Sequence, residues 1–294
     1  MVNSRVPDRP SEVRARRIAP ADRDAVAALL RQGFGLRRSR AFWQRAVDVL
    51  ATRKVADGMP QLGYLLESGG RAVGTILVIA SRPRTGADPD AIRCSLSSWY
   101  VEPQYRIYAA MLAALALNHD NATHLNISPA ANTLPTLAVQ GYTRYCDGVF
   151  IVCPLLAWGD GAATVLAADR RPAVPFEAFE WNLLRDHAEF GCVAFWCVTA
   201  ERAYPFVFRR RLAKGVLPCA QLIYCRDTTD VARFSGLIGR YLAVRGCPLV
   251  VLDASGPMPG LPGIYVDGRP KYFKGPEKPR LGDLAYTEAA LFGL

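Results

Sequence analysis

The residues whose types and spacing best suit chemistry lie in one stretch, Trp99-Tyr-Val-Glu-Pro-Gln-Tyr-Arg-Ile-Tyr-Ala-Ala-Met-Leu112. A strand pattern ends at Val101, Pro103 interrupts it, and a helical pattern begins near Arg106. The first N–H groups of a helix have no partner within the helix, and they lie at the positive end of its dipole. A strand that leads directly into a helix N-terminus therefore predicts an anion site, most often for phosphate.

The elements around this stretch predict a mixed α/β module that closes near residue 157. They are expected in this order: a strand over 13–18, helices over 21–34 and 39–52, a hairpin over 61–67 and 72–81, a strand over 91–103, a helix over 104–117, a strand over 123–128, a helix over 130–139 and a hairpin over 141–156. Ser39 is the expected N-cap of the second helix. The final hairpin is expected to turn at Asp147-Gly148.

The stretch from Trp99 to Leu112 resembles the GNAT superfamily of acyl-coenzyme A-dependent N-acyltransferases. Its hallmark is a strand that ends V-x-P, followed by an Arg or Gln that opens a loop and helix around the pyrophosphate of coenzyme A. Val101, Pro103, Tyr105 and Arg106 match that pattern in order and spacing. The order of elements over roughly residues 13–156 is also similar to that family, whose fourth and fifth strands splay apart around the acyl-pantetheine.

The resemblance implies which backbone groups would bind an acyl-coenzyme A, with an acetyl or a longer acyl chain. Those of Trp99, Tyr100 and Val101 would pair with the pantetheine. The implied ligands of the pyrophosphate are the backbone amides of Arg106, Ile107, Tyr108, Ala109, Ala110 and Met111. The family pattern has Gly where this chain has Ala109, and Gly or Ala where it has Met111. Leu137 stands where the family often has a tyrosine general acid.

Acyl transfer to an amine needs orientation, a route for the amine proton and donors for the carbonyl oxygen. Ser98, Glu102 and Asn126 are the candidate catalytic residues, because each could hold a water molecule that removes the proton. Tyr100 and Tyr108 are candidates for protonating the leaving thiolate. The acceptor implied by the resemblance is a small-molecule or peptide amine.

The second half of the chain repeats the rhythm of strands and helices without the V-x-P motif. The segment 157–175 is rich in Gly, Pro and small residues, which predicts a joint between domains at 1–157 and 158–294. A single helix is expected over 228–246, and the Gly- and Pro-rich tail over 256–282 is expected to be a loop. The predicted fold class is therefore α/β (α+β), with two tandem GNAT-like mixed-sheet domains and flanking helices. The second domain would complete the substrate cleft.

Composition limits the remaining classes of function. The chain has 294 residues, of which 51% are hydrophobic and 21% charged, which excludes a disordered or coiled-coil protein. No apolar run is long enough to span a membrane, and no apolar signal sequence opens the chain, so a cytoplasmic protein is expected. The eight cysteines form no C-x-x-C pair and the three histidines are scattered, so we predict reduced core thiols and no metal site.

The formal net charge of +10 leaves alternatives to an acyltransferase open. Most of the positive residues are arginines. The net positive charge is larger in the first half of the chain than in the second, which suits a cofactor that carries phosphates. A second hypothesis is a catalytically decayed acyl-coenzyme A-binding or scaffold module, favoured by Met111 and Leu137. A third is a nucleic-acid or anionic-surface binding protein, although no DNA- or RNA-binding motif accompanies the charge. Lys271, Lys274, Lys278 and Arg280 could form an anion-binding lip, but a solvated loop is the favoured interpretation.

Overall fold

The computed structural model describes residues 12–35, 38–82, 91–119, 121–157, 162–213 and 215–293. These residues form two compact units with a mixed α/β fold, as predicted. Described residues up to His124 belong to the first unit, and those from Leu125 onward belong to the second. The units therefore divide the chain at His124, within a strand, whereas the sequence predicts the joint at 157–175.

The first unit is built in the predicted order of elements. Its elements are β1 (Val13–Arg17), α1 (Arg23–Phe34), α2 (Arg40–Thr52), β2 (Gly63–Ser68), β3 (Arg71–Ser81), β4 (Ile92–Val101), α3 (Ala109–Leu117) and β5 (Ala122–Asn126), in which the division between the units falls. The strands follow one another as β1-β2-β3-β4-β5, and the first four are antiparallel. Ser39 caps α2 as expected, its Oγ accepting from Phe42 N at 3.1 Å.

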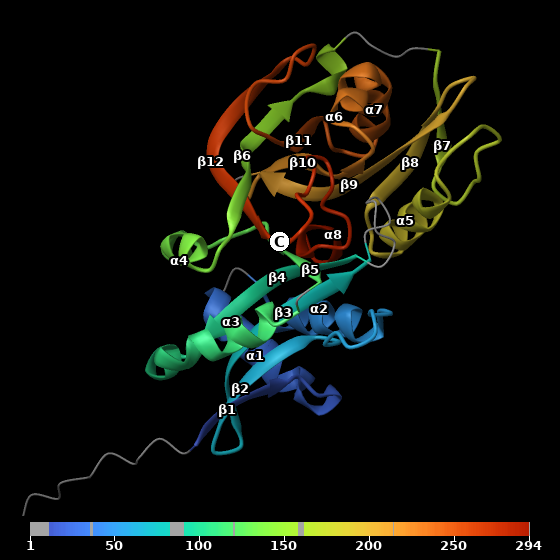
Figure 1. Ribbon diagram of the computed structural model, residues 1–294. Coiled ribbons are helices and arrows are strands. Elements are labelled where there is room, and N and C mark those ends of the chain that lie inside the picture. The colour runs from blue at the N-terminus through green and yellow to red at the C-terminus, as the bar shows by residue number, and fades with distance from the viewer. Residues whose placement is uncertain are drawn as a thin grey trace, which may run out of the picture. The chain divides into compact units, whose positions relative to one another are not determined.

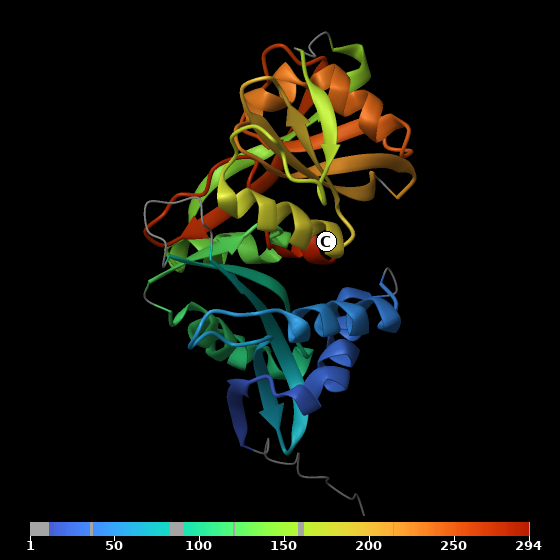
Figure 2. The same cartoon turned by 90° about the vertical axis from the view of Figure 1, so that its right-hand side faces the viewer.

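Helices cover both faces of the strands of this unit. In Figure 2 the blue helices α1 and α2 lie on one side of the teal strands and the green helix α3 lies on the other. On the α3 side, Leu112 and Ala116 are buried against Leu66, Ile76 and neighbouring apolar residues. The packing on both faces fixes the end of β4, from which the chain enters α3.

A partly buried ion-pair network holds β1 to β2 in this unit. Arg16 bonds to both oxygens of Asp22 at 2.6 and 2.9 Å and to Glu67 at 2.8 Å. The hydrogen bonds from Arg16 lower the pKa of Asp22 from its ordinary value of 3.8. A carboxyl group whose pKa is lowered by folding stabilises the protein above its unfolded pKa, and this contribution is lost as the pH falls through the folded pKa.

We therefore expect Asp22→Asn to lower the free energy of unfolding by about 1 kcal/mol at neutral pH and to flatten its acid dependence. Urea unfolding of the two proteins, compared at neutral pH and below pH 3.8, measures both effects. The exposed Asp24 on the first turn of α1 provides the control, and Asp24→Asn should alter the acid dependence less than Asp22→Asn does. An acid dependence equal to the wild type in Asp22→Asn would contradict the assignment.

The second unit contains the remaining described elements. They are α4 (Leu134–Val139), β6 (Thr143–Val152), β7 (Thr164–Ala167), α5 (Ala178–Glu189), β8 (Val193–Val198), β9 (Ala203–Ala213), β10 (Leu217–Cys225), α6 (Thr228–Arg233), α7 (Ser235–Ala243), β11 (Leu249–Ala254), β12 (Gly263–Lys274) and α8 (Glu288–Leu291). The strand order is β12-β6-β11-β10-β9-β8-β7. Strands β10 and β11 pair in parallel, whereas β6 with β11 and β12, β9 with β8 and β10, and β7 with β8 pair antiparallel.

This unit repeats the plan of the first. A strand (β7) leads to a helix (α5), then to three antiparallel strands (β8–β10), helices (α6 and α7) and a further strand (β11). Val231 and Ile238 of α6 and α7 are buried on one side, and Leu183 and Leu184 of α5 lie in a separate buried cluster together with Ala290 of α8. Figure 1 shows α6 and α7 and, separately, α5 beside the strands β8 to β10. The repeated order confirms the predicted tandem architecture.

Three elements of this unit differ from the sequence-based prediction. Residues 143–152 form one continuous strand, not a hairpin, because β6 pairs with β11 and β12. Gly148 is needed for that pairing and not for a turn, since a Cβ there would lie 2.3 Å from Val266 O. The predicted loop over 256–282 contains β12, whose register shifts between Asp267 and Lys271 accommodate Gly268 and Pro270. The predicted single helix over 228–246 is divided at Phe234 into α6 and α7.

The structure also shows where the cysteines and the residues of the predicted anion-binding lip lie. All eight cysteines are free and seven are buried, as predicted for core thiols. Lys271 does not belong to an exposed lip, because it is buried, with its Nζ 3.4 Å from Asp253 Oδ1 and bonded to Ile127 O at 3.2 Å. Arg280 donates to Cys225 O. Of the four cations proposed for that lip, Lys271 and Arg280 therefore make hydrogen bonds within this unit.

Candidate functional site

A β-bulge distorts β4 next to the stretch that the sequence singles out. Ser98 and Trp99 together stand opposite Ile76 of β3, between the pairs Leu77–Ser97 and Thr75–Tyr100. Ser98 has φ 51°, a left-handed conformation that non-glycine residues seldom adopt. Bulges turn backbone groups out of the ladder and bend the strand, and they recur beside active sites.

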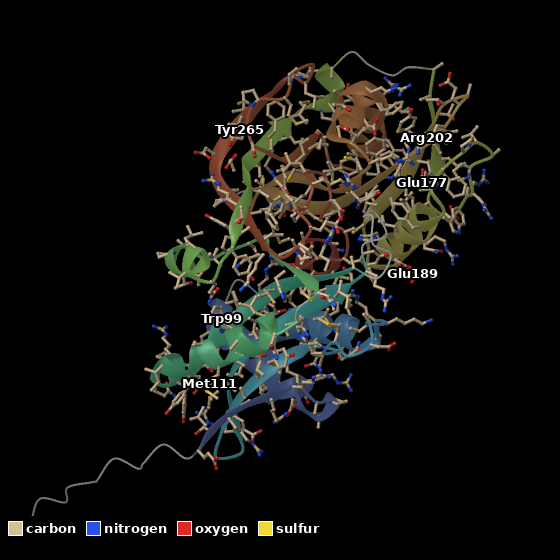
Figure 3. The ribbon with its side chains drawn as sticks, in the orientation of Figure 1. Trp99, Met111, Glu177, Glu189, Arg202 and Tyr265 are labelled. Atoms are coloured by element: carbon tan, nitrogen blue, oxygen red, sulfur yellow. The ribbon has the colours of Figure 1, made fainter. Side chains whose placement is uncertain are left out.

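The side chains at the bulge combine hydroxyl and aromatic groups. Ser97 Oγ and Ser98 Oγ are 3.1 Å apart; Ser97 is buried and Ser98 is half-buried. Trp99 and Tyr100 are also half-buried. The indole Nε1 of Trp99 is buried, and it has no hydrogen-bond partner among the described atoms. Trp99 on β4 and Met111 at the start of α3 are labelled in Figure 3.

The close approach of α1 to the bulge depends on a glycine. A Cβ at Gly33 would lie 2.3 Å from carbons of the Tyr100 ring, so only glycine lets the ring lie against the helix backbone. Tyr100 is thereby held between β4 and the end of α1. The role of Tyr100 in proton transfer stays a prediction.

The strained serine provides a test of this geometry. We expect Ser98→Gly to retain or raise the melting temperature, because glycine adopts the left-handed conformation without steric cost. Ser98→Val should lower stability by about 1–2 kcal/mol, since a β-branched side chain is strained there. Thermal unfolding of both variants beside the wild type measures the difference. Equal melting temperatures for Ser98→Gly and Ser98→Val would show that the bulge does not form.

The helix that follows β4 starts later than the sequence predicts. Pro103–Tyr108 forms a 3-10 helix, η3, and the α-helix begins at Ala109 instead of near Arg106. Pro103 starts the 3-10 turn because its ring fixes φ and it lacks an N–H donor. Tyr108 is the N-cap residue of α3, and no described side chain caps this N-terminus. The N–H of Ala109 donates to Arg106 O in η3, and the dipole of the nine-residue helix that follows favours an anion at its start.

Small or outward-directed side chains surround this helix start. Ala109 is half-buried and Ala110 is exposed, so neither blocks approach to the backbone. Met111 is 38% exposed, and its bulk lies toward solvent rather than in the core. Arg106 and Ile107 are exposed on η3, and Arg106 places a cation beside the helix start. The predicted ligands Arg106 to Met111 therefore form one continuous surface turn.

Glu102, the nearest carboxylate, is fully engaged by other residues. Its two oxygens accept from Arg71 at 2.7 and 2.8 Å, and Gln104 Nε2 donates at 2.8 Å. Glu102 is buried, and its backbone N–H donates to Val73 O at 2.9 Å. The bond to Glu102 raises the pKa of the Arg71 guanidinium. This network ties the end of β4 to the start of β3, which suits a positioning role better than that of a base.

The other sequence candidates lie apart from the bulge in the chain. Asn126 is half-buried at the end of β5 and belongs to the second unit, and its catalytic role stays a prediction. Leu137 is buried in α4, so its position offers no proton donor. The bulge itself was missed from the sequence, because serine gives no signal for a left-handed conformation.

The described residues contain neither a metal-binding cluster nor a membrane-spanning helix. No group of three or more His, Cys, Asp or Glu side chains within 12–35, 38–82, 91–119, 121–157, 162–213 and 215–293 could hold a metal ion. In the same part of the chain, no helix has the length and apolar character needed to cross a membrane.

Solved structures with a similar fold cover most of the chain. A putative acetyltransferase from Pyrococcus horikoshii aligns with a TM-score of 0.57 at 10% identity, over 93% of this chain and 93% of that one. A GCN5-related N-acetyltransferase from Kribbella flavida aligns with a TM-score of 0.56 at 14% identity, over 90% and 71%. Another from Anabaena variabilis aligns with a TM-score of 0.55 at 10% identity, over 89% and 72%. No protein-family model matches the sequence, and no curated protein matches it significantly.

Proposed function

Since this chain has the fold of the GCN5-related N-acetyltransferases, two such units in tandem, we propose that it transfers an acyl group from coenzyme A to an amine. The observation that carries the proposal is the bulged β4, which leads through η3 into an α3 N-terminus that no described side chain caps. Fold alone does not specify function; what supports this one is a left-handed residue in β4 followed by a helix start whose dipole would favour an anion.

The first unit has the features that the phosphates of coenzyme A require. The exposed Arg106 supplies a positive charge, and the small side chains of Ala109 and Ala110 leave the backbone of the helix start accessible. Trp99, Tyr100 and Val101 would bind the pantetheine through the backbone edge of β4. Acyl-coenzyme A, once bound, supplies an activated thioester.

The chain's own residues would then orient the acceptor and move protons. Backbone N–H groups turned outward at the bulge would hold the carbonyl oxygen of the acyl group. The hydroxyl of Ser98 would hold the water that removes the amine proton, assisted by Ser97 at 3.1 Å. Tyr100, held against Gly33, or Tyr108, at the N-cap of α3, would protonate the departing thiolate.

The substrates are proposed only by class. The acceptor is a small-molecule or peptide amine, and the donor is acetyl-coenzyme A or a longer acyl-coenzyme A. The free cysteines of the chain suit the reducing conditions of the cytoplasm, where these donors are available.

Two measurements test this function. Isothermal titration with acetyl-coenzyme A and longer acyl-coenzymes A measures binding, and release of free thiol in the presence of a panel of amines measures transfer. We expect binding by at least one acyl chain length and thiol release with at least one amine. No binding at millimolar concentrations of any acyl-coenzyme A would overturn the proposal.

One alternative is supported by particular residues. Glu102 is engaged by Arg71 and Gln104, and position 137 holds a leucine, which cannot transfer a proton. A protein that binds acyl-coenzyme A as a sensor or scaffold would retain the helix start and lose turnover. Binding without thiol release across the amine panel would favour this alternative.

A further inference from the structure

The strands β10 and β11 of the second unit stop pairing before either of them ends. Their parallel register covers Cys219–Leu249, Ala220–Val250 and Gln221–Val251, although β10 continues to Cys225 and β11 to Ala254. A bulge at Ile223, between the pairs Leu222–Phe208 and Tyr224–Val207, marks the same point on β10. These strands occupy the places that β4 and β5 have in the first unit, where β4 is also bulged.

The unpaired edge of β10 is bonded to the C-terminal segment, residues 282–292. Cys225 N donates to Gly282 O at 3.0 Å, and Leu284 N donates to Ile223 O at 2.7 Å. Tyr224 and Asp283 form an antiparallel bridge between these two bonds. Since β9 pairs with the other edge of β10 as far as Cys225, the segment must lie on the edge that pairs with β11 further back. In Figure 1 the red segment that runs into α8 lies beside β10.

The segment is anchored along its whole length. Asp283, Leu284 and Ala285 are buried, as are all four residues of α8. Tyr286 N donates to His187 Nε2 at 3.1 Å, and Tyr286 OH donates to Asp186 at 2.6 Å. Arg209 donates to Ala290 O at 3.2 Å. These contacts come from α5, β9 and β10, so the segment is an integral part of this unit and not a loose tail.

The helix start that follows β10 is also occupied. Asp227 caps α6, its Oδ1 accepting from Thr229 N and Thr229 Oγ1 at 2.8 Å each. These bonds lower the pKa of Asp227, so its carboxylate is charged at neutral pH. An anion from solution would meet this negative charge. The corresponding start of α3 in the first unit has no such cap among the described residues.

We propose that the C-terminal segment is a built-in occupant of the second unit's ligand edge, and that it confines acyl-coenzyme A to the first unit. The segment makes the main-chain bonds with β10 that an extended ligand would make, and Asp227 takes the place of the ligand's phosphate. The confinement of acyl-coenzyme A rests on the function proposed above, whereas the occupancy does not. The protein should bind one acyl-coenzyme A per chain.

A glycine pair provides a matched test of the occupancy. Gly282 has φ +79°, and a Cβ there would lie 2.8 Å from Cys225 Sγ and 3.1 Å from Thr228 Cγ2. Gly215, in the turn between β9 and β10, also has φ +79° but has no atom within 4 Å of a Cβ. Gly282→Val should displace the segment, while Gly215→Val introduces the same backbone strain without a collision.

The first readout is alkylation of Cys225, followed by mass spectrometry of the full chain. Cys225 is fully buried, and burial raises the pKa of its thiol, so wild-type labelling should be slow. We expect Gly282→Val to label at Cys225 about tenfold faster or more, and Gly215→Val to label at the wild-type rate. A folded Gly282→Val that labels at the wild-type rate would overturn the proposal.

The second readout is amide hydrogen exchange of the wild-type protein, which tests the proposal even if Gly282→Val does not fold. The amide hydrogens of Cys225 and Leu284 should exchange slowly, and saturating acetyl-coenzyme A should not change their rates. Exchange of both at the rate of an exposed loop, or acceleration by acetyl-coenzyme A of about tenfold or more, would overturn the proposal. If acetyl-coenzyme A binds nowhere, the proposed function fails, and the alkylation result still decides the occupancy.

Discussion

Replacing Ala110 with glutamate is expected to weaken acetyl-coenzyme A binding by about 100-fold, without loss of the fold. Ala110 is exposed in the first turn of α3, so a longer side chain disturbs no core contact. A carboxylate there would take the place of the pyrophosphate at the helix start and repel its charge. The loss corresponds to about 3 kcal/mol of binding free energy.

The same substitution separates binding from stability. A carboxylate in the first turn interacts favourably with the helix dipole, so the melting temperature of Ala110→Glu should equal or slightly exceed that of the wild type. Ala114 is exposed on the same helix, one turn later, and Ala114→Glu is the matched control. Isothermal titration should give near wild-type affinity for the control. Unchanged affinity in Ala110→Glu would place the phosphate site elsewhere.

Removing Glu180 is expected to cost the largest amount of stability, about 3 kcal/mol or more. Glu180 is fully buried in α5, and Arg226 bonds to both of its oxygens. Tyr224 OH lies 3.4 Å from Glu180 Oε1, and the backbone N–H of Glu177 donates to Glu180 Oε2 at 3.2 Å. Glu180→Ala would leave the guanidinium of Arg226 without its partner in a largely buried place.

A neighbouring ion pair on the same helix start provides the comparison. Glu177 accepts from Arg202 at 2.9 Å, and these two side chains, labelled in Figure 3, are 54% and 40% exposed. Glu177→Ala should therefore cost only about 1 kcal/mol, from a lost surface pair and helix cap. Urea unfolding of the two variants measures the difference. A cost for Glu180→Ala no larger than that for Glu177→Ala would show that the buried pair is not formed.

The predicted elements that agree with the structure are those with local signals. Apolar residues at helical spacing in 21–34 and 39–52 gave α1 and α2, and Ser39 gave the cap. The runs 61–67 and 72–81, separated by the turn residues 68–71, gave β2 and β3. These signals depend on a few neighbouring residues, and the tertiary structure agrees with them.

The predictions that were wrong involve partners far apart in the sequence. Asp147-Gly148 is a strong hairpin signal, but β6 continues through it because β11 and β12 supply partners more than a hundred residues later. Gly268 and Pro270 favour a loop, yet β12 tolerates them through its register shifts. No local sequence pattern predicts such pairing between distant strands.

At the candidate site, too, local signals were predicted correctly and features that depend on strand pairing were not. The Val101-x-Pro103 motif indicated the strand-to-helix connection correctly, although the α-helix begins at Ala109. The left-handed Ser98 and the pairing of Glu102 with Arg71 depend on the register of β4 against β3, which the sequence does not state. The register of β4 against β3 therefore determines that Glu102, one of the three catalytic candidates, is paired with Arg71.

The most direct measurement is amide hydrogen exchange across the whole chain, with and without saturating acetyl-coenzyme A. Binding at the bulged β4 and the start of α3 predicts slower exchange at Trp99 to Val101 and at Ala109 to Met111, with no change at Ile223 to Cys225. Unchanged exchange at Trp99 to Val101 and at Ala109 to Met111, or protection confined to the second unit, would contradict the assignment of the acyl-coenzyme A site.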